Sequence, residues 1–137
     1  NFIINASFLK GPKLKEMKEY LVLGNCNEVF RIATEDILYV LARGNYSVFY
    51  FTYGDTVSVP LSIGKVGECI NKLCPQTSKD FVRVGRSLMI NMSHILYVNL
   101  SDEKLVLLDR NKERKEVRAS KTSLKELAEL IRNSTLR

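Results

Sequence analysis

Three basic residues stand where the sequence indicates that one regular element ends and another begins. Arg43 precedes a Gly-Asn pair, Arg86 follows a glycine between two apolar segments, and Lys121 follows a serine near a leucine-rich stretch. A guanidinium group donates paired hydrogen bonds to a phosphate group or a guanine edge, whereas an ammonium group acts as a point charge. Each residue alone is interpreted as a solvated surface charge. Three of them at the ends of rigid elements predict a surface that binds a polyanion.

The overall charge favours the same class of partner. The 137 residues include 21 Lys and Arg against 15 Asp and Glu, which gives a net charge of +6 and a pI of about 9.3. A positive net charge of this size favours a polyanionic partner. Positive charge is densest from 110 to 121, where two glutamates oppose six cations, namely Arg110, Lys112, Arg114, Lys115, Arg118 and Lys121.

The residue types give little support for catalysis or metal binding. The single histidine, His94, precedes an apolar run and is interpreted as a core or strand-edge residue rather than a general base. Ser87 and Ser93 therefore lack a base that would activate them as nucleophiles. One histidine and three scattered cysteines do not form a cluster of metal ligands. We predict that the chain is not an enzyme and holds no metal ion or cofactor.

The cysteines and the apolar segments bear on the cellular compartment. Cys26, Cys69 and Cys74 are odd in number and lack CxxC spacing, which favours reduced thiols over a disulfide framework. The chain has no run of about 18 apolar residues, which a membrane helix requires. Its first residues also lack the pattern of a signal peptide. We expect a cytoplasmic location and no membrane contact.

Short β-prone segments must position the basic residues. Valine, isoleucine, phenylalanine and tyrosine recur in runs that are bounded by Gly, Asn and Asp, a pattern typical of antiparallel strands joined by tight turns. These runs predict a mostly β domain. The expected strands span 20–23, 29–32, 37–41, 46–53, 56–61, 81–84, 88–90, 95–100, 105–108 and 116–118.

Two helices interrupt this β pattern. Ser62 is expected to cap a helix that ends near Leu73, and Ser120 or Thr122 is expected to cap a C-terminal helix. In both segments apolar residues recur at helical spacing. Thr34 is expected to cap a single helical turn whose first residues are acidic.

Three separated motifs resemble one family. The stretch FVRVGRSLMINMSHILYV is similar to the central signature of the LytTR DNA-binding domains of bacterial transcription regulators, F-x-R-x-H-R-S-x-x-V-N-x-x-x-I. EDILYVLARGNYSVFY resembles the family's upstream strand and Gly-Asn-Tyr loop, and VRASKTSLKELAELI resembles its closing segment. The resemblance covers about 20–131. Gly85 stands where the family usually has His.

This resemblance implies an architecture and a set of contacts. LytTR domains have an elongated β fold of short antiparallel strands, with one inserted short helix and a C-terminal helix. They lie along duplex DNA and insert loops into successive major grooves. Base reading would then fall to Arg86 and the 45–47 loop, and phosphate contact to Arg43, Arg118 and Lys121. The full set of residues expected at the DNA is Arg43, Asn45, Tyr46, Ser47, Arg86, Ser87, Arg118, Ser120 and Lys121.

The resemblance also implies a context. We expect a linker or the end of an upstream region at 1–19, the LytTR-type domain at 20–133 and a tail at 134–137. The domain would be the output domain of a two-component response regulator, following a receiver or sensor region. It would bind direct repeats in promoters, as a homodimer on DNA. The departures at Gly85 and at Lys121, where the family more often has Arg, bear on base preference.

Two alternatives remain open at this stage. The first is a non-catalytic interaction or dimerisation module whose basic surface and apolar patches dock a protein partner. The second is RNA binding on a β surface, which requires aromatic side chains on one exposed face. The residues that would supply that face are Tyr46, Phe49, Tyr50, Phe51 and Tyr53.

Overall fold

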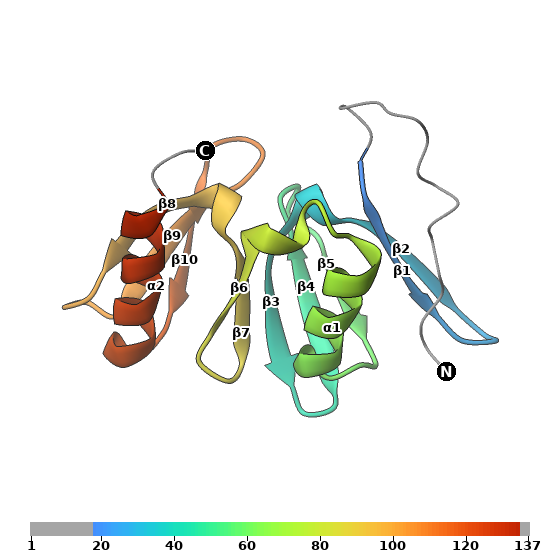
Figure 1. Cartoon of the computed structure of the whole chain (residues 1–137). Helices are drawn as coiled ribbons and strands as arrows, with labels where there is room; N and C mark the ends of the chain where they lie inside the picture. Colours follow the sequence, from blue (N-terminus) through green and yellow to red (C-terminus); the bar gives the residue numbers. More distant parts are fainter. Residues whose placement is uncertain (1–17, 135–137) are drawn as a thin grey trace.

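The computed structural model describes residues 18–134, in which three antiparallel sheets stand side by side (Figure 1). A two-stranded sheet comprises β1 (Tyr20–Gly24) and β2 (Val29–Ala33). A five-stranded sheet has the order β5-β4-β3-β7-β6 and a three-stranded sheet the order β10-β9-β8. Their bounds are β3 (Ile37–Arg43), β4 (Tyr46–Phe51), β5 (Thr56–Val59), β6 (Phe81–Val84), β7 (Leu88–Asn91), β8 (Ile95–Asn99), β9 (Lys104–Leu108) and β10 (Arg114–Arg118).

One helix covers each of the two larger sheets (Figure 1). The inserted helix α1 (Ile63–Leu73) lies on the five-stranded sheet, and α2 (Lys121–Asn133) lies on the three-stranded sheet. Residues 18–134 include three single turns of 3-10 helix: η2 (Thr34–Asp36) and η4 (Met92–His94) each join two strands, and η3 (Ser78–Asp80) lies between α1 and β6. The mostly β fold with one inserted and one C-terminal helix, predicted from the sequence, is confirmed.

The domain has two apolar cores that share the central strands β3 and β7. Val40 and Met89 pack with α1 and the β1–β2 hairpin, whereas Leu38 and Ile90 pack with β9 and α2. All four residues of β7 are buried, as expected for a strand that is covered on both faces. Because the two cores meet on the same two strands, the helices and sheets form one continuous packed body.

The helix caps follow the sequence in two of three cases. The Ser62 hydroxyl accepts a hydrogen bond from the Lys65 amide, and the Ser120 hydroxyl accepts one from the Ser123 amide. The prediction for Thr34 is wrong, because Thr34 is the first residue of η2 and its buried hydroxyl bonds Thr77 at 2.7 Å. The Thr77 hydroxyl donates in turn to the Glu19 carboxylate at 2.8 Å, so Thr34 takes part in a network with distant residues and does not cap its own helical turn.

Glu19 lies at the boundary between the expected linker and the expected domain. Residues 1–17 and 135–137, which include most of the expected linker and tail, lie outside the described residues. The Glu19 carboxylate accepts hydrogen bonds from the Gln76 and Thr77 amides at 3.0 and 2.7 Å. These contacts join Glu19, the last residue of the expected linker at 1–19, to the turn that follows α1.

The β9–β10 loop links the three-stranded sheet to its neighbour at the upper edge of Figure 1. The Arg110 amide donates to the Thr52 carbonyl at 2.9 Å, and the Arg110 guanidinium lies 3.7 Å from the Asp36 carboxylate. Asp109 shapes this loop by accepting hydrogen bonds from the Asn111 and Glu113 amides. The Glu113 amide above all, with the Asn111 amide and the nearby Lys115 cation, lowers the pKa of Asp109.

Candidate nucleic-acid interface

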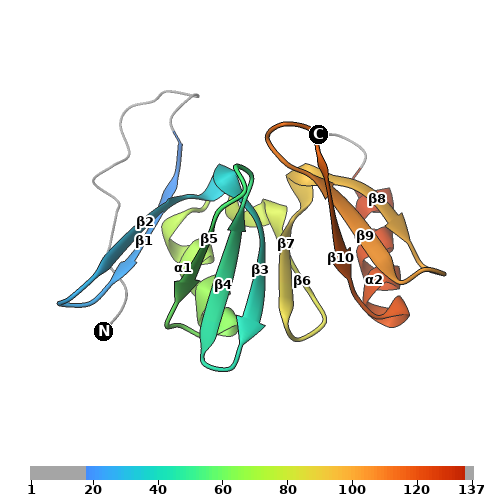
Figure 2. The ribbon, with the colours of Figure 1, turned by 180° about the vertical axis from the view of Figure 1, so that it is seen from behind.

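Four chain reversals lie at the same end of the molecule, the lower edge in Figure 1 and Figure 2. They are the β3–β4 turn, the β6–β7 turn, the entry to α1 and the entry to α2. Antiparallel pairing explains the first two, because β3 pairs with both β4 and β7 and Leu41 stands opposite Leu88. The three expected contact loops, which are the β3–β4 turn, the β6–β7 turn and the entry to α2, are therefore aligned along one edge of the molecule, and the entry to α1 lies at the same edge.

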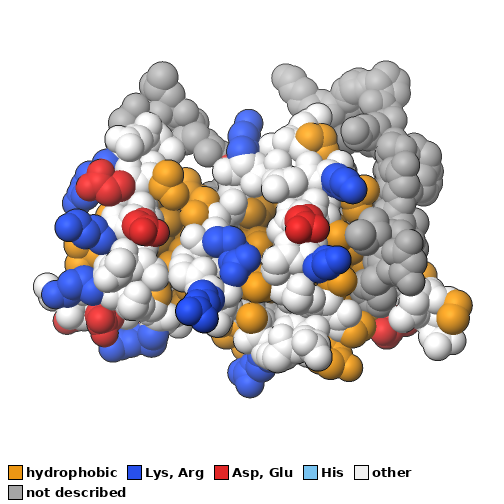
Figure 3. All heavy atoms as spheres, turned by 60° about the horizontal axis from the view of Figure 1, so that its bottom comes forward, with side chains coloured by type: hydrophobic (Ala, Val, Ile, Leu, Met, Phe, Trp, Pro, Cys, Tyr) orange, Lys and Arg blue, Asp and Glu red, His pale blue; other side chains and the backbone are white. Residues whose placement is uncertain are grey.

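The face at this end is basic in its middle (Figure 3). Lys and Arg side chains gather there, and acidic side chains lie to either side of them. Arg43, Arg86 and Lys121 are all exposed, and within residues 18–134 none of them forms an ion pair. Free cations on adjacent turns can meet successive phosphate groups of a nucleic-acid backbone.

The first turn, between β3 and β4, is short and open. Arg43 pairs with Tyr46, so only Gly44 and Asn45 make the reversal, and Gly44 has a φ of +61°. Arg43 and Asn45 are exposed and Tyr46 is 50% exposed. Their side chains project from the edge of the sheet, where they are accessible to a ligand.

Ser47 is the one expected contact residue that points inward. Its side chain is fully buried, and its hydroxyl donates a 2.7 Å hydrogen bond to the Leu61 carbonyl. In β4 it falls on the same face as Phe49 and Phe51, which are in the core. The expectation for Ser47 is corrected accordingly, since its side chain connects β4 to the chain entering α1.

The second turn, between β6 and β7, is held in place by its neighbours. Arg86 and Ser87 are exposed at its tip. The Ser87 carbonyl accepts a hydrogen bond from the Ala42 amide at 2.8 Å, and the Arg86 carbonyl accepts one from the Arg83 guanidinium at 2.6 Å. Gly85 has a φ of +72°, which favours glycine.

The third reversal, at the start of α2, presents Lys121 beside the second turn. A Cβ built on Gly85 would lie 3.1 Å from the Ser123 hydroxyl, so these two elements are in close contact. Ser120 is the N-cap, and its hydroxyl also bonds that of Ser123 at 3.0 Å. The Lys121 amide donates to the Glu103 carboxylate at 3.2 Å. Ser120 therefore acts mainly in shaping the helix entry, while Lys121 extends from it.

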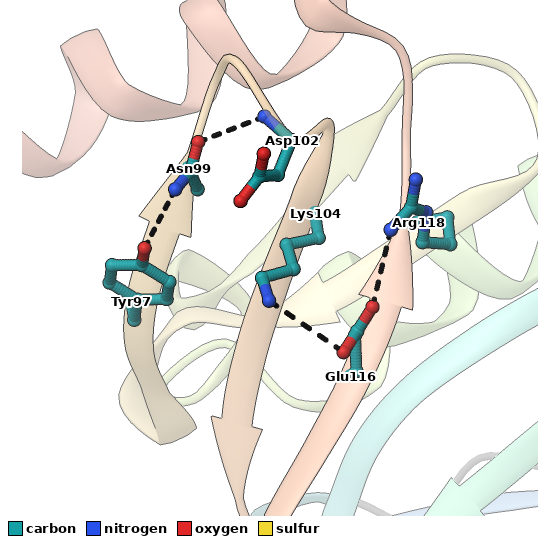
Figure 4. A network of polar contacts seen from close by, with 6 residues as sticks. All are labelled: Tyr97, Asn99, Asp102, Lys104, Glu116 and Arg118. Atoms are coloured by element: carbon teal, nitrogen blue, oxygen red, sulfur yellow. Dashed lines mark hydrogen bonds and ion pairs between the residues drawn. The ribbon is translucent and has the colours of Figure 1, made fainter.

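Arg118 belongs to a separate network on the three-stranded sheet (Figure 4). Its guanidinium lies 3.3 Å from the Glu116 carboxylate, whose other oxygen is 4.0 Å from the Lys104 ammonium. Asn99 supports the adjoining turn by accepting a hydrogen bond from the Asp102 amide and donating one to Tyr97. Arg118 is 66% exposed, but its charge is partly neutralised, unlike the charges of the three turn cations.

Sequence reasoning missed two residues of this region. Arg83 reaches the second turn from β6, and Glu103, which has a φ of +52°, brings a carboxylate to the entry of α2. The alternation in FVRV indicates that Arg83 is exposed, but the direction of a long side chain cannot be read from it. Nothing in the sequence pairs Glu103 with a helix that starts 18 residues later.

Other chemistry is limited among the residues that the structure describes. Between 18 and 134 no three His, Cys, Asp or Glu side chains come together in a way that could hold a metal ion. The His94 ring nitrogen Nε2 lies 3.1 Å from the Glu35 carbonyl, and burial raises the pKa of the Cys69 thiol. Neither described helix is long and apolar enough to cross a bilayer.

The aromatic run in β4 does not form a single exposed face. Phe49 and Phe51 are buried in the core beneath α1. On the opposite face Tyr50 stacks against Tyr39 of β3, with ring centroids 4.4 Å apart. Tyr46 and Tyr53, at the two ends of the run, are the exposed ones. The five rings are thus divided between two faces and do not form the single exposed aromatic surface that RNA binding by a β surface would use.

Comparisons with known proteins agree with this geometry. The family model of the LytTr DNA-binding domain matches residues 27–132. The fold is similar to that of the LytTr DNA-binding domain of a response regulator from Bacillus cereus, with a TM-score of 0.56 and 18% identity over 84% of this chain and 98% of that chain. No curated protein matches the chain. Because the family model spans most of the sequence, the chain belongs to the LytTR family of DNA-binding domains.

Proposed function

We propose that this domain binds double-stranded DNA with sequence preference, through the three basic turns at one end of the fold. The observation that carries the proposal is the alignment of Arg43, Arg86 and Lys121 on adjacent reversals, each exposed and without an ion-pair partner among the described residues. Turns held by strands enter a groove in a fixed register, and free cations supply contacts to phosphate. The loops would occupy successive major grooves, where base edges can be distinguished.

The turns differ in the contacts that they are suited to make. Arg86, on a turn fixed by its neighbours, is assigned to a base edge, where its planar guanidinium can bond guanine at two points. Asn45 and Tyr46, on the open turn, are assigned to a second base contact. Arg43 and Lys121 are assigned to phosphate. Arg118 would have to leave Glu116 before it could join them.

The proposed biological role is that of the output domain of a bacterial transcription regulator. A receiver or sensor region would precede the domain, as in two-component response regulators, and would control its access to promoter direct repeats as a homodimer. This assignment places the protein in the cytoplasm and requires no catalytic step or cofactor. Family membership and the basic face support it.

The first test is a selection from random duplex DNA with the wild-type domain and with Arg86→Ala. We expect a short consensus from the wild type and loss of preference at one position from the variant, because only the base contact of Arg86 has been removed. Recovery of salt-sensitive binding without any consensus would overturn sequence-specific recognition. If Arg86→Ala lowers the affinity for selected and random DNA equally, Arg86 does not read a base, and the sequence preference of the domain must come from other residues.

A matched control is available on the same helix as Lys121. Arg132 is exposed in the last turn of α2, at the end away from the basic turns, and it pairs with Glu129 at 3.7 Å. Arg132→Ala changes the net charge as much as Arg86→Ala does. We expect Arg132→Ala to leave the recovered consensus intact, so that any loss seen with Arg86→Ala reflects position rather than net charge.

A protein-binding role is the second candidate, because one specific observation favours it. An open groove of about 520 Å³ lies between the edge strand β8 and the C-terminal half of α2, and Leu96 and Tyr97 are 45% and 42% exposed beside it. Leu96→Asp should abolish partner binding under this reading and leave DNA binding unchanged. Partner binding that survives replacement of all three turn cations but fails with Leu96→Asp would favour this candidate over the first.

A further inference from the structure

The β6–β7 turn is restrained at each of its three residues. Gly85 lies against Ser123 of α2, the Arg86 carbonyl accepts from the Arg83 guanidinium, and the Ser87 carbonyl accepts from the Ala42 amide of β3. The Arg83 bond is the shortest of these at 2.6 Å, and its donor is charged. Charge-assisted hydrogen bonds are stronger than neutral ones, so this contact is the principal restraint on the backbone of Arg86.

Arg83 is well placed to exert this restraint from outside the turn. It lies opposite Met89 in the β6–β7 register, one pair before the turn begins, and its side chain is exposed. Its guanidinium reaches forward by three residues to Arg86 and has no ion-pair partner among the described residues. The hydrogen bond therefore acts on the tip of the turn without occupying the outward-facing side chain of Arg86.

We propose that Arg83 is a positioning residue for sequence recognition, which fixes the backbone of Arg86 so that its side chain meets the base edge in one orientation. This inference rests on the proposed function. A long flexible side chain loses rotational freedom on binding, and prior restraint of its backbone lowers that loss. Arg83 would thus contribute to the choice of DNA sequence, although its own guanidinium is turned toward the protein.

The rival explanation is that Arg83, as an exposed cation on a basic face, contacts a phosphate group itself. The two explanations differ in three measurable ways. A phosphate contact strengthens binding to all duplexes, raises the dependence of affinity on salt, and acts independently of Arg86. A positioning contact changes the ratio of affinities for selected and random DNA, leaves the salt slope unchanged, and has no effect once Arg86 is absent.

The test is a double-mutant cycle with Arg83→Met and Arg86→Ala, measured on selected and random duplexes at several salt concentrations. Methionine keeps much of the length of the side chain but removes the donor. We expect Arg83→Met to lower the selected-to-random affinity ratio by about tenfold, and by less than about twofold when Arg86→Ala is already present. Arg83→Lys, which keeps a charged donor, should restore part of the ratio.

The outcomes separate this inference from the proposed function. If the wild type recovers no consensus, both fail. If Arg86→Ala blurs the consensus but Arg83→Met reduces affinity equally on all DNA and lowers the salt slope by about one, only the positioning role fails.

Lys65, exposed in the first turn of α1 at the same end, provides the control: Lys65→Met removes a nearby charge and should leave the selected-to-random affinity ratio unchanged. Thermal unfolding of each variant verifies folding, and Arg83→Lys carries the test should Arg83→Met not fold.

Discussion

The β3–β4 and β6–β7 turns stand next to each other but are built differently. At the first, a Cβ added to Gly44 would meet nothing within 4 Å, so the turn extends freely from the sheet. At the second, the same addition to Gly85 would meet Ser123, and hydrogen bonds restrain both Arg86 and Ser87. The second turn is restrained by more contacts than the first, so under the proposed function the second would read bases strictly and the first would make more tolerant contacts.

The largest expected effect compares the tips of these two turns. Arg86→Ala should cost about 1–3 kcal/mol in affinity for the selected duplex and relax preference at one position. Asn45→Ala should cost about 1 kcal/mol or less, because ordering the free turn offsets part of the contact energy. Affinity measurements on selected and single-position variant duplexes check both values. Equal losses, each confined to a single base position, would remove the distinction between an adaptable turn and a preorganised one.

The two turn glycines provide the next comparison. Alanine at either position must adopt a positive φ, which costs about 1–2 kcal/mol of folding free energy. Gly85→Ala should lose more than Gly44→Ala, because the Ser123 hydroxyl must also move. Adding Ser123→Ala should reduce the loss at position 85 and leave the loss at position 44 unchanged. Chemical denaturation of the wild type, of Ser123→Ala and of each glycine variant in both backgrounds measures these differences. An absence of rescue would show that the Ser123 hydroxyl does not hinder a side chain at position 85.

The sequence predicts the local elements of this fold well, for a physical reason. Strands and turns follow from residue types within a few positions of each other, and so do the Ser62 and Ser120 caps. The division of ten strands into three sheets depends on contacts between distant segments. Thr34 illustrates the limit, because its hydroxyl is bonded to Thr77, 43 residues away, rather than to its own helical turn.

The candidate site shows the same boundary between local and distant information. The glycine before Arg86 marks an exposed turn, and that placement is predictable from sequence alone. Ser47 is among the residues expected at the DNA, yet strand alternation groups it with Phe49 and Phe51, which predicts the buried side chain that the structure shows. The hydrogen bond from Arg83 to Arg86 could not be predicted, because its formation depends on rotamers of a long side chain across a turn.

Lys121 tests the interpretation of the third reversal as a phosphate contact. Lys121→Ala should weaken binding to selected and random DNA by the same factor and lower the salt slope by about one. Glu103→Gln should shift both affinities in the opposite direction, because it removes a negative charge beside the Lys121 amide. Titrations at several salt concentrations measure both slopes. A change of base preference with Lys121→Ala would instead assign this residue to a base edge, alongside Arg86.

The smallest expected effect on DNA binding comes from the opposite end of the molecule. The pKa of Asp109 is lower in the folded protein than in the unfolded chain, where it is near 3.8. The Asp109 carboxylate therefore stabilises the fold above pH 3.8. This stabilisation is lost as the pH falls through the pKa of the folded state. Asp109→Asn keeps an oxygen that can accept from the Asn111 and Glu113 amides but removes the charge near Lys115. Denaturation at pH 7 should therefore find the variant less stable than the wild type, with the two converging as the solution is acidified below pH 3.8.

The ratio of affinities for selected and random DNA at pH 7 should stay unchanged in Asp109→Asn, because the β9–β10 loop lies away from the basic turns. A fall in that ratio would mean that the conformation of the recognition turns depends on the β9–β10 loop. The contacts of Gly85, Arg86 and Ser87 would then not be sufficient to fix the β6–β7 turn.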